Sequence, residues 1–274
     1  MKRYVTALTI AGSDPSGGAG LQADLKTFSA LGVYGATAIT AVTVQNTVGV
    51  KYVHALPPQV VYDQITTVME DIDVDAAKIG MVNDAATLDA IVRALTVQRP
   101  KFLVVDPVMV STSGCALMQP DALAIMKERL LPMADLVTPN LPEAWTLAGN
   151  DSSVDAAAQA ILGLGVKALL IKGGHAEGKI KTDYLYIYKG GSISRTEFSA
   201  ETVDTENTHG TGCTLSAAIA AYHARGCGME EAVRQAKAYL TKALVAGAGV
   251  TAWHGHGPVN HLSDPCKMIV KDEA

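Results

Sequence analysis

The sequence has little of what marks several large classes of protein. Aromatic residues make up only 5%, and no apolar run approaches the roughly 18 residues that a membrane span needs, so we expect no membrane partner. Lys and Arg number 22 against 27 Asp and Glu, a net charge of −5, which argues against nucleic-acid binding because clustered cations supply that affinity. The 4 cysteines form no CxxC pair, and scattered thiols in a chain this long favour a reducing cytoplasmic location over a disulfide framework.

What is present indicates a large folded core. Apolar residues make up 49% and charged residues 18% of the 274 residues, which excludes a disordered chain. No Pro- or Ser-rich linker divides the chain, so we expect a single domain over residues 1–274. Residues 4–11 form a short apolar run after two cations. We interpret this run as a buried first strand rather than a secretion signal, because it is brief and leads into a Gly-Ser-Asp-Pro turn.

Apolar patterns of strand and helix alternate along almost the whole chain. Strands are predicted over residues 4–11, 33–44, 77–81, 102–105, 136–138 and 168–171. Helices are predicted around residues 21–28, 61–72, 88–95, 123–131, 143–148, 154–164, 213–224 and 230–246. Residues 184–198 are predicted to form a β-hairpin, the only clear antiparallel unit, at the sheet edge. The pattern predicts a three-layer α/β/α fold with a mostly parallel central sheet.

The most informative segment is Asn207-Thr208-His209-Gly210-Thr211-Gly212-Cys213, which directly precedes an apolar helix. Glycines let backbone N–H groups converge on an anion, and a helix N-terminus adds partial positive charge, so the segment predicts an anion site. Cys213 falls in the first helical turn, where the pKa of a thiol is lowered and a thiolate becomes accessible. The alternative is an ordinary glycine loop with a buried cysteine.

Two other glycine-rich segments resemble P-loops without completing one. In residues 12–20, Gly18 stands where a P-loop has its lysine. In residues 173–180, Ile180 replaces the Ser or Thr that would bind magnesium. No strand is followed by a GxGxxG pattern with a downstream acidic residue, which argues against a dinucleotide-dependent oxidoreductase.

Polar residues follow three of the predicted strands. These segments are Asp106-Pro107-Val108, Asn140-Leu141-Pro142-Glu143 and Lys172-Gly173-Gly174-His175. Ligands bind at the carboxyl ends of the strands in parallel sheets, so we expect these side chains to share one edge. Two carboxylates, an amide and a lysine there would suit a magnesium–polyphosphate site.

Eight segments over nearly the whole chain carry a resemblance to a known family. They are AGSDPSGGAGLQADLKTFSALGVYG (11–35), VQNT (44–47), KIGM (78–81), DPVM (106–109), TPNLPEA (138–144), KGGH (172–175), NTHGTGCTLSAA (207–218) and GHGPV (255–259). They resemble the hydroxymethylpyrimidine/phosphomethylpyrimidine kinases of thiamine biosynthesis, which have the ribokinase-like fold. Many sugar kinases of that fold carry Asp where this chain has Cys213, so the cysteine resembles the pyrimidine and pyridoxal kinase branch.

The resemblance implies that ATP and Mg²⁺ serve two steps at one site. 4-Amino-5-hydroxymethyl-2-methylpyrimidine becomes its monophosphate and then its diphosphate. Matching positions imply that the pyrimidine is bordered by Gly12, Ala19, Asp24, Gln45, Met81 and Val108. They imply a catalytic anion hole of Gly210, Gly212 and Cys213, with Lys172 beside it. They imply that magnesium and ATP are handled by Asp106, Asn140, Glu143, Lys172 and Thr208, with Asp106 and Glu143 as metal ligands. Relatives are commonly dimers, so a homodimer is expected.

Gln45 supplies an argument from chemistry. A side-chain amide can accept from an exocyclic amino group while donating to the adjacent ring nitrogen, and pyridoxal has no such edge. Gln45 therefore favours the pyrimidine, although a glutamine at a strand end can also pair with backbone. A pyridoxal kinase, or an enzyme using both rings, is the nearest alternative. A non-catalytic pyrimidine sensor on the same fold is another.

The two steps differ in their need for a base. The first nucleophile is a primary alcohol that must lose a proton, and the Cys213 thiolate is the predicted general base. The second nucleophile is a phosphate oxygen, largely ionised at neutral pH because its second pKa is ~6. We therefore expect loss of Cys213 to harm the first step far more than the second.

Overall fold

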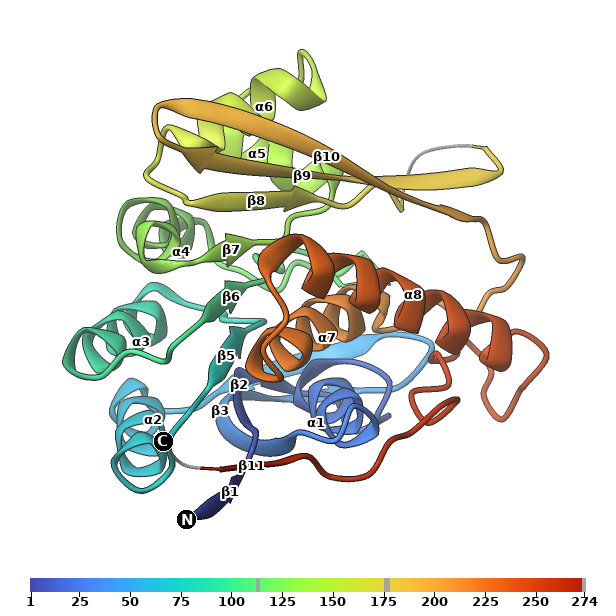
Figure 1. Ribbon diagram of the computed structural model, residues 1–274, viewed down its shortest axis with the longest axis horizontal. Coiled ribbons are helices and arrows are strands. Elements are labelled where there is room, and N and C mark those ends of the chain that lie inside the picture. The colour runs from blue at the N-terminus through green and yellow to red at the C-terminus, as the bar shows by residue number, and fades with distance from the viewer. Residues whose placement is uncertain (112–113, 175–177, 273–274) are drawn as a thin grey trace.

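A computed structural model describes residues 1–111, 114–174 and 178–272, so His175 lies outside the described residues. The strands of its main sheet are β2 (Thr6–Ser13), β3 (Tyr34–Gln45), β4 (Val50–Ala55), β5 (Ala76–Ile79), β6 (Leu103–Val105), β7 (Leu136–Val137), β8 (Ala168–Ile171), β9 (Ile180–Lys189) and β10 (Ser192–Glu201). Their order across the sheet is β10-β9-β8-β7-β6-β5-β2-β3-β4 (Figure 1). A second, two-stranded sheet pairs β1 (Lys2–Tyr4) with β11 (Val270–Asp272).

Helices cover both faces of the main sheet, which confirms the predicted α/β fold. They are α1 (Gly20–Ala30), α2 (Pro58–Asp71), α3 (Ala85–Val97), α4 (Pro120–Ile125), α5 (Leu141–Ala148), α6 (Val154–Leu162), α7 (Thr211–Ala224) and α8 (Met229–Gly247). One apolar core joins the sheet to α2 through α6, and the other joins it to α1, α7 and α8. Figure 1 shows α2, α3 and α4 on one side of the strands and α7 and α8 on the other.

The helix α7 lies deepest of the helices because its sequence is built from small residues. It contacts β5 and β6 on one side and α8 and α1 on the others. Its alanines, among them Ala217, Ala218, Ala220 and Ala221, are fully buried. Small side chains allow the helix to approach the sheet closely while a second helix covers it. The first turn of α7 is therefore held firmly at the edge where the parallel strands end.

The sheet has more antiparallel structure than the sequence indicated. The predicted hairpin is β9–β10, and it does form one edge of the sheet. The other edge is also antiparallel, because β4 returns beside the end of β3, and the prediction of a single antiparallel unit was wrong. The strand β4 was missed because its sequence, VKYVHA, mixes charged and apolar residues on a largely exposed edge. The predicted helix 123–131 is also not one α-helix: it is α4 followed by a π turn over residues 126–130 and a 3-10 turn over residues 131–133, which contains Pro132.

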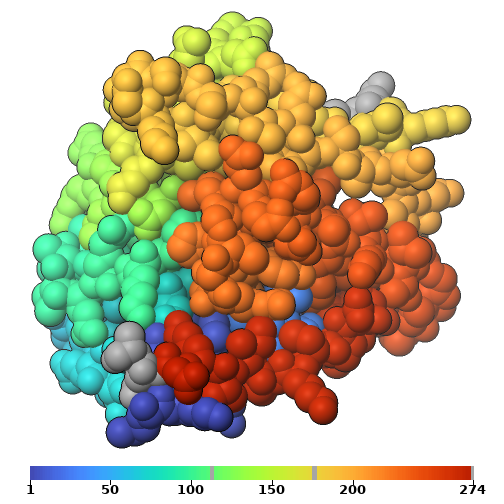
Figure 2. Space-filling view, viewed as in Figure 1, coloured from blue at the N-terminus to red at the C-terminus, as the bar shows by residue number. Residues whose placement is uncertain are grey.

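A single carboxylate fastens the two ends of the chain to the sheet. Asp75, only 4% exposed, accepts from Arg3 Nη2 at 2.6 Å, Lys271 Nζ at 2.6 Å and Lys101 Nζ at 3.1 Å. It also accepts from the backbone N–H of Thr6 at 3.1 Å. Figure 2 shows the C-terminal segment, in red, against the N-terminal residues, in blue. Burial alone would raise the pKa of Asp75, but these donors outweigh it and hold the pKa well below its usual range.

Replacing Asp75 by Asn is expected to lower the midpoint of thermal unfolding at pH 7 by several degrees, because about 1 kcal/mol shifts the midpoint of a chain this long by roughly 2–4 °C. The folded-state pKa is depressed, so the stabilisation is present above pH ~4 and is lost as the pH falls. Thermal scans at pH 7 and pH 3 should therefore show a difference between wild type and Asp75→Asn that shrinks on acidification. Asp89→Asn, which removes two exposed ion pairs, with Arg93 and Arg129, is the control and should change little. A pH-independent difference would contradict the assignment.

Within the described residues, no helix is both long and apolar enough to cross a membrane.

Candidate functional site

Polar residues gather where the parallel strands of the main sheet end. Asp106 follows β6, Asn140 follows β7, and Lys172 follows β8. Asn140 and Lys172 pair with each other in an isolated parallel bridge. The first turn of α7 lies against the same edge, since a Cβ placed on Gly212 would lie 3.4 Å from Lys172 Nζ and 3.8 Å from Asp106 Oδ2. The structure thus brings the predicted anion loop and the predicted phosphate-handling residues together.

Asp106 is the most enclosed of these groups. It is 1% exposed and accepts from Lys172 Nζ at 2.7 Å, Ser216 Oγ at 3.1 Å and Thr138 Oγ1 at 3.2 Å. Burial alone would raise the pKa of Asp106, but Lys172 and then Lys78 outweigh it and lower the pKa, so the carboxylate is ionised. The same pairing raises the pKa of Lys172, although burial acts to lower it. Sequence reasoning missed Ser216, although it lies one helical turn after Gly212 and so faces the same way.

Glu143 and Asn140 support each other at the start of α5. The Asn140 side chain accepts from the Glu143 backbone N–H at 2.9 Å, and Glu143 Oε2 accepts from the Asn140 N–H at 2.8 Å. This reciprocal capping box fixes both side chains beside Asp106. Burial raises the pKa of Glu143, Lys172 opposes that effect, and Asp106 adds to it.

The two carboxylates fit the predicted magnesium ion. Among the described residues, no group of three or more His, Cys, Asp or Glu side chains could hold a metal by itself. Magnesium in kinases is bound by one or two carboxylates together with waters and substrate phosphates. Asp106 and Glu143, beside the amino end of α7, are a donor set of that kind.

The loop before α7 is in backbone contact with the loop after β2. Gly210 has φ 79°, and a Cβ there would lie 1.9 Å from the Gly18 carbonyl oxygen. The neighbouring His209 places Nε2 2.8 Å from Asp14 Oδ2 and donates its backbone N–H to Gly257 at 3.0 Å. Thr208 completes the turn, because its carbonyl accepts from the Thr211 N–H at 3.3 Å. Three distant segments therefore meet beside the predicted anion hole.

Asp14 organises the loop after β2, and sequence reasoning overlooked it. Its carboxylate accepts the backbone N–H groups of Ser16 at 2.8 Å, Gly18 at 3.2 Å and Ala19 at 2.8 Å. Burial would raise the pKa of Asp14, but hydrogen bonds from His209, Ser16 and then Gln45 outweigh it, and the pKa lies well below its usual range. The signal was present in the Asp-Pro-Ser sequence, because an aspartate before such a turn commonly accepts the following N–H groups.

Most residues predicted to border the pyrimidine lie around this loop. A Cβ on Gly12 would lie 3.2 Å from the Met81 sulfur. Met81 shares a small apolar cluster with Val108. Ala19 and Gln45 both hydrogen-bond to Asp14, as described above. Gln45 also lines a small cavity with Asn46, Thr47, Gly49, Val50, Ser111, His209 and His256.

Asp24 does not lie with the other residues predicted to border the pyrimidine. Its side chain is fully buried within α1 and bonds to the ammonium of Lys78, at 2.9 and 3.0 Å from its two oxygens. The carboxylate is thus occupied by protein, and the structure does not support the expected contact of this side chain with the pyrimidine. Lys78 was not identified from the sequence, because a lysine in a short apolar strand gives no sign of its partner.

Cys213 differs from expectation in its protonation. It is partly buried in the first turn of α7, and the Gly20 backbone N–H donates to its sulfur. Burial nevertheless raises the pKa of the thiol to about 11. The prediction of a lowered pKa was wrong, because the desolvation of the sulfur exceeds the benefit of the helix N-terminus. The resting form of Cys213 is the thiol.

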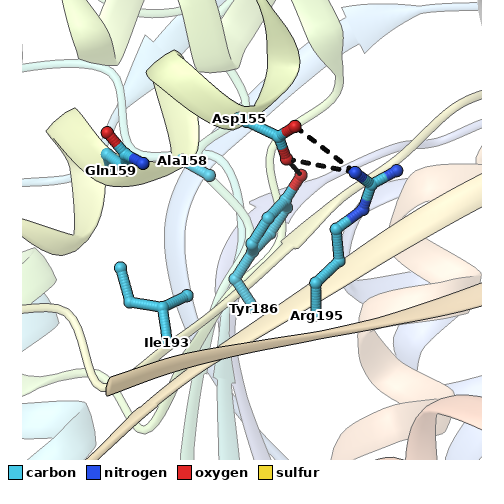
Figure 3. Close-up of a pocket in the computed structure, with 6 residues that line it drawn as sticks. All are labelled: Asp155, Ala158, Gln159, Tyr186, Ile193 and Arg195. Carbon is cyan, nitrogen blue, oxygen red and sulfur yellow. Dashed lines mark hydrogen bonds and ion pairs between the residues drawn. The ribbon is translucent and has the colours of Figure 1, made fainter. Parts of the chain in front are cut away.

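A larger cavity, of about 290 Å³, contains none of the predicted site residues. It lies between α6 and the β9–β10 hairpin (Figure 3). Asp155 accepts from the Tyr186 hydroxyl at 2.6 Å and from Arg195 Nη1 at 3.3 Å. Figure 3 shows these three side chains pointing toward one another. These three side chains therefore bond to one another, away from the residues predicted to bind substrate, ATP or magnesium.

Comparison with known proteins agrees with the geometry. A family model described as phosphomethylpyrimidine kinase matches residues 14–260. The chain is 50% identical over 261 residues to a hydroxymethylpyrimidine/phosphomethylpyrimidine kinase of Rhizobium meliloti, covering 93% of this chain and 96% of that protein. It is similar to the crystal structure of a phosphomethylpyrimidine kinase from Clostridium difficile, with 44% identity, a TM-score of 0.75, and coverage of 87% and 99% of the two chains. An ADP complex of Bacillus subtilis pyridoxal kinase gives 36% identity, a TM-score of 0.86, and coverage of 95% and 98%. With its fold, its edge of polar groups and these relatives, the chain belongs to the hydroxymethylpyrimidine/phosphomethylpyrimidine kinase family.

Proposed function

We propose that the protein transfers phosphoryl groups from ATP to 4-amino-5-hydroxymethyl-2-methylpyrimidine, first to the monophosphate and then to the diphosphate. The observation that carries the proposal is the approach of Gly212 to the Lys172–Asp106 pair at the first turn of α7. Backbone N–H groups, a lysine and two carboxylates at one edge are what phosphoryl transfer requires. The R. meliloti relative bears the name of this activity, and the B. subtilis pyridoxal kinase is in complex with ADP.

The chemistry divides among a few side chains. In the first step the Cys213 thiol gives its proton to solvent. The proton of the substrate hydroxyl then passes to the thiolate, the hydroxyl oxygen bonds to the γ-phosphorus, and the bond to ADP breaks. The N–H groups around Gly210 and Gly212, together with Lys172, stabilise the charge on the transferring oxygens. Asp106 and Glu143 would hold magnesium, which supplies charge neutralisation at the phosphates. Asn140 orients Glu143, and Thr208 shapes the turn that presents the N–H groups.

In this proposal Gln45 recognises the pyrimidine ring by hydrogen bonds from its side-chain amide. Asp14 is ionised and can only accept, so the amide directs an N–H toward it. The Gln45 carbonyl oxygen and the second N–H are then available for the amino group and adjacent nitrogen of the pyrimidine. Gly12, Ala19, Met81 and Val108 would shape the apolar remainder of the site.

The proposal is tested by coupled ADP release with Mg-ATP, offering the hydroxymethylpyrimidine and pyridoxal in parallel and following products by phosphorus NMR. Conversion of the pyrimidine to mono- and then diphosphate is expected. Preference for pyridoxal would keep the fold and the phosphate site and overturn the assignment of Gln45. No turnover of either ring would favour the sensor interpretation.

A second candidate function is pyridoxal phosphorylation. The specific observation in its favour is the structural similarity to the B. subtilis pyridoxal kinase, whose TM-score of 0.86 exceeds the 0.75 of the C. difficile phosphomethylpyrimidine kinase. Sequence identity ranks the two in the opposite order, 36% against 44%. Gln45→Leu is expected to weaken turnover of the pyrimidine more than that of pyridoxal, because only the pyrimidine uses both polar groups of the amide.

We also infer that the protein forms a homodimer in the cytoplasm. Support for a dimer comes from the β3–β4 edge, where Val44 and Tyr52 are paired and Val42 and Tyr52 are 42% and 61% exposed. Support for the cytoplasm comes from four cysteines that are all free. Analytical ultracentrifugation should show a dimer for the wild type and a monomer for Tyr52→Glu. A monomeric wild type would overturn the dimer.

A further inference from the structure

The fully buried ion pair of Lys78 and Asp24 has no assigned role in phosphoryl transfer. Both side chains have no exposed surface, and Thr9 Oγ1 donates to Asp24 at 2.5 Å. A buried ion pair seldom stabilises a fold more than well-packed apolar residues would, because both ions lose their hydration. Stability alone therefore does not explain a pair placed in the core of the sheet.

The pair lies on the face of the sheet that α1 and α7 cover. Side chains alternate along β5, so Ala77 and Ile79 enter the core shared with α2 and α3 while Ala76 enters the core shared with α7. Lys78 has the parity of Ala76 and so points toward α1 and α7. Its register partner on β2 is Thr9. Figure 1 shows α1 and α7 on the same side of these strands.

Two further contacts lead from the pair to the predicted base. Asp24 lies four residues after Gly20 on α1, and the Gly20 N–H donates to the Cys213 sulfur. Gly80, just after β5, leaves room for the ammonium, since a Cβ there would lie 2.7 Å from Lys78 Nζ. Asp24 therefore lies about one helical turn along α1 from the residue that contacts the thiol.

The charges around Cys213 come from four elements. Lys78 on β5 lowers the pKa of the thiol, and its effect is larger than the opposing effect of Asp24 on α1 or of Asp106 after β6. Lys172 after β8 also interacts with the sulfur. Lys78 itself stays charged, because Asp24, Cys213 and Asp106 together outweigh the burial that would lower its pKa. Of the two members of the pair, Lys78 thus has the larger effect on Cys213.

We propose that Lys78 is a positioning residue for the first phosphorylation: its charge, kept in the interior by Asp24, stabilises the Cys213 thiolate that accepts the proton of the substrate hydroxyl. The inference rests on the proposed function. In the step, the thiol first gives its proton to solvent. The substrate O–H bond then breaks, its proton joins sulfur, and the oxygen bonds to the γ-phosphorus as the bond to ADP breaks. The second step, with an ionised phosphate as nucleophile, does not need this charge.

The test compares the wild type with Lys78→Met/Asp24→Leu, in which both charges are removed together so that neither is left buried alone. The pH dependence of iodoacetamide labelling at Cys213, read by peptide mass spectrometry, should shift to higher pH, because the effect of Lys78 on the thiol exceeds the opposing effect of Asp24. Single-turnover rates at pH 7.5 should fall about tenfold or more in the first step and less than about threefold in the second. If the double variant folds poorly, the same labelling and rate measurements are made on Lys78→Gln, whose side chain can still donate a hydrogen bond to Asp24.

Lys101→Met is the matched control, because it removes a cation from the Asp75 cluster far from Cys213 and should leave both rates and the labelling profile unchanged. An unshifted labelling profile, with equal losses in both steps, would show that the pair is structural only and overturn the proposal. Failure of the wild type to phosphorylate the pyrimidine would overturn the proposed function, whereas the labelling experiment would still report whether Lys78 acts on the thiol.

Discussion

Cys213→Ala is expected to slow the first phosphorylation by about 10²–10³-fold, the range for loss of a general base. The second phosphorylation should slow by less than about tenfold, because a phosphate with a second pKa of ~6 is already ionised. Rapid-quench single-turnover assays, started separately with the hydroxymethylpyrimidine and its monophosphate, measure the two steps. The pH dependence of the two rates gives a second test of the base. Burial raises the pKa of the thiol to about 11, so the first rate should climb between pH 7 and pH 9 while the second stays nearly flat.

The control for this prediction is Cys227→Ala, at a partly buried free cysteine beyond the other end of α7. It should leave both steps within about twofold of the wild type, as is usual for substitutions away from a site. Equal losses in the two steps of Cys213→Ala would reject the base and leave the cysteine as a group that merely shapes the anion hole. A loose transition state, which places little demand on a base, would produce that result.

Gly210→Ala is expected to lower the rate of both steps by about 10²–10³-fold, the range for the loss of one well-placed oxyanion donor. The added Cβ would lie 1.9 Å from the Gly18 carbonyl oxygen, so the two loops must separate. Their separation moves the N–H groups at the start of α7 away from the transferring phosphoryl group. Steady-state kinetics should show the loss mainly in kcat, since Gln45, which contacts the ring in the proposed function, lies at the end of β3 and outside both loops.

Gly226→Ala separates this clash from simple backbone strain. Gly226 follows the last turn of the same helix at φ 100°, and a Cβ there meets no atom within 4 Å. Both variants carry the strain of a left-handed alanine, about 1–2 kcal/mol, but only Gly210→Ala disturbs the site. Thermal unfolding should therefore show losses of stability in both, and activity should fall in Gly210→Ala alone. Comparable activity of the two variants would show that the Gly18–Gly210 contact has no part in catalysis.

Sequence patterns were sufficient for the features that depend on local periodicity. The buried parallel strands, and the polar residues Asp106, Asn140 and Lys172 that end three of them, follow from runs of apolar residues and from the rule that strand ends share an edge. Features that depend on which side chains meet across the sheet were missed. The Asp24–Lys78 pair joins a helix to a strand 54 residues away, and no periodicity reports such a pairing.

The protonation of Cys213 shows the same limit in energetic terms. A helix N-terminus is visible in the sequence, and by itself it lowers the pKa of a thiol. The desolvation that overrides it depends on α1, β5 and the segment after β6 packing around the sulfur, which is a property of the packed molecule. Asp14 was overlooked for a related reason, because its partner His209 is 195 residues away.

The contact between the loops of Asp14 and His209 bears on when activity can arise during synthesis. A ribosome releases the first loop long before it has made the second, and the Gly257 carbonyl that receives the His209 N–H comes later still. Contacts of such long sequence separation form late in folding. A nascent chain ending at residue 250 would hold every residue expected to bind substrate, ATP or magnesium, yet the anion loop would lack one of its supports. We therefore expect a chain that ends at residue 250 to have less kinase activity than the full chain.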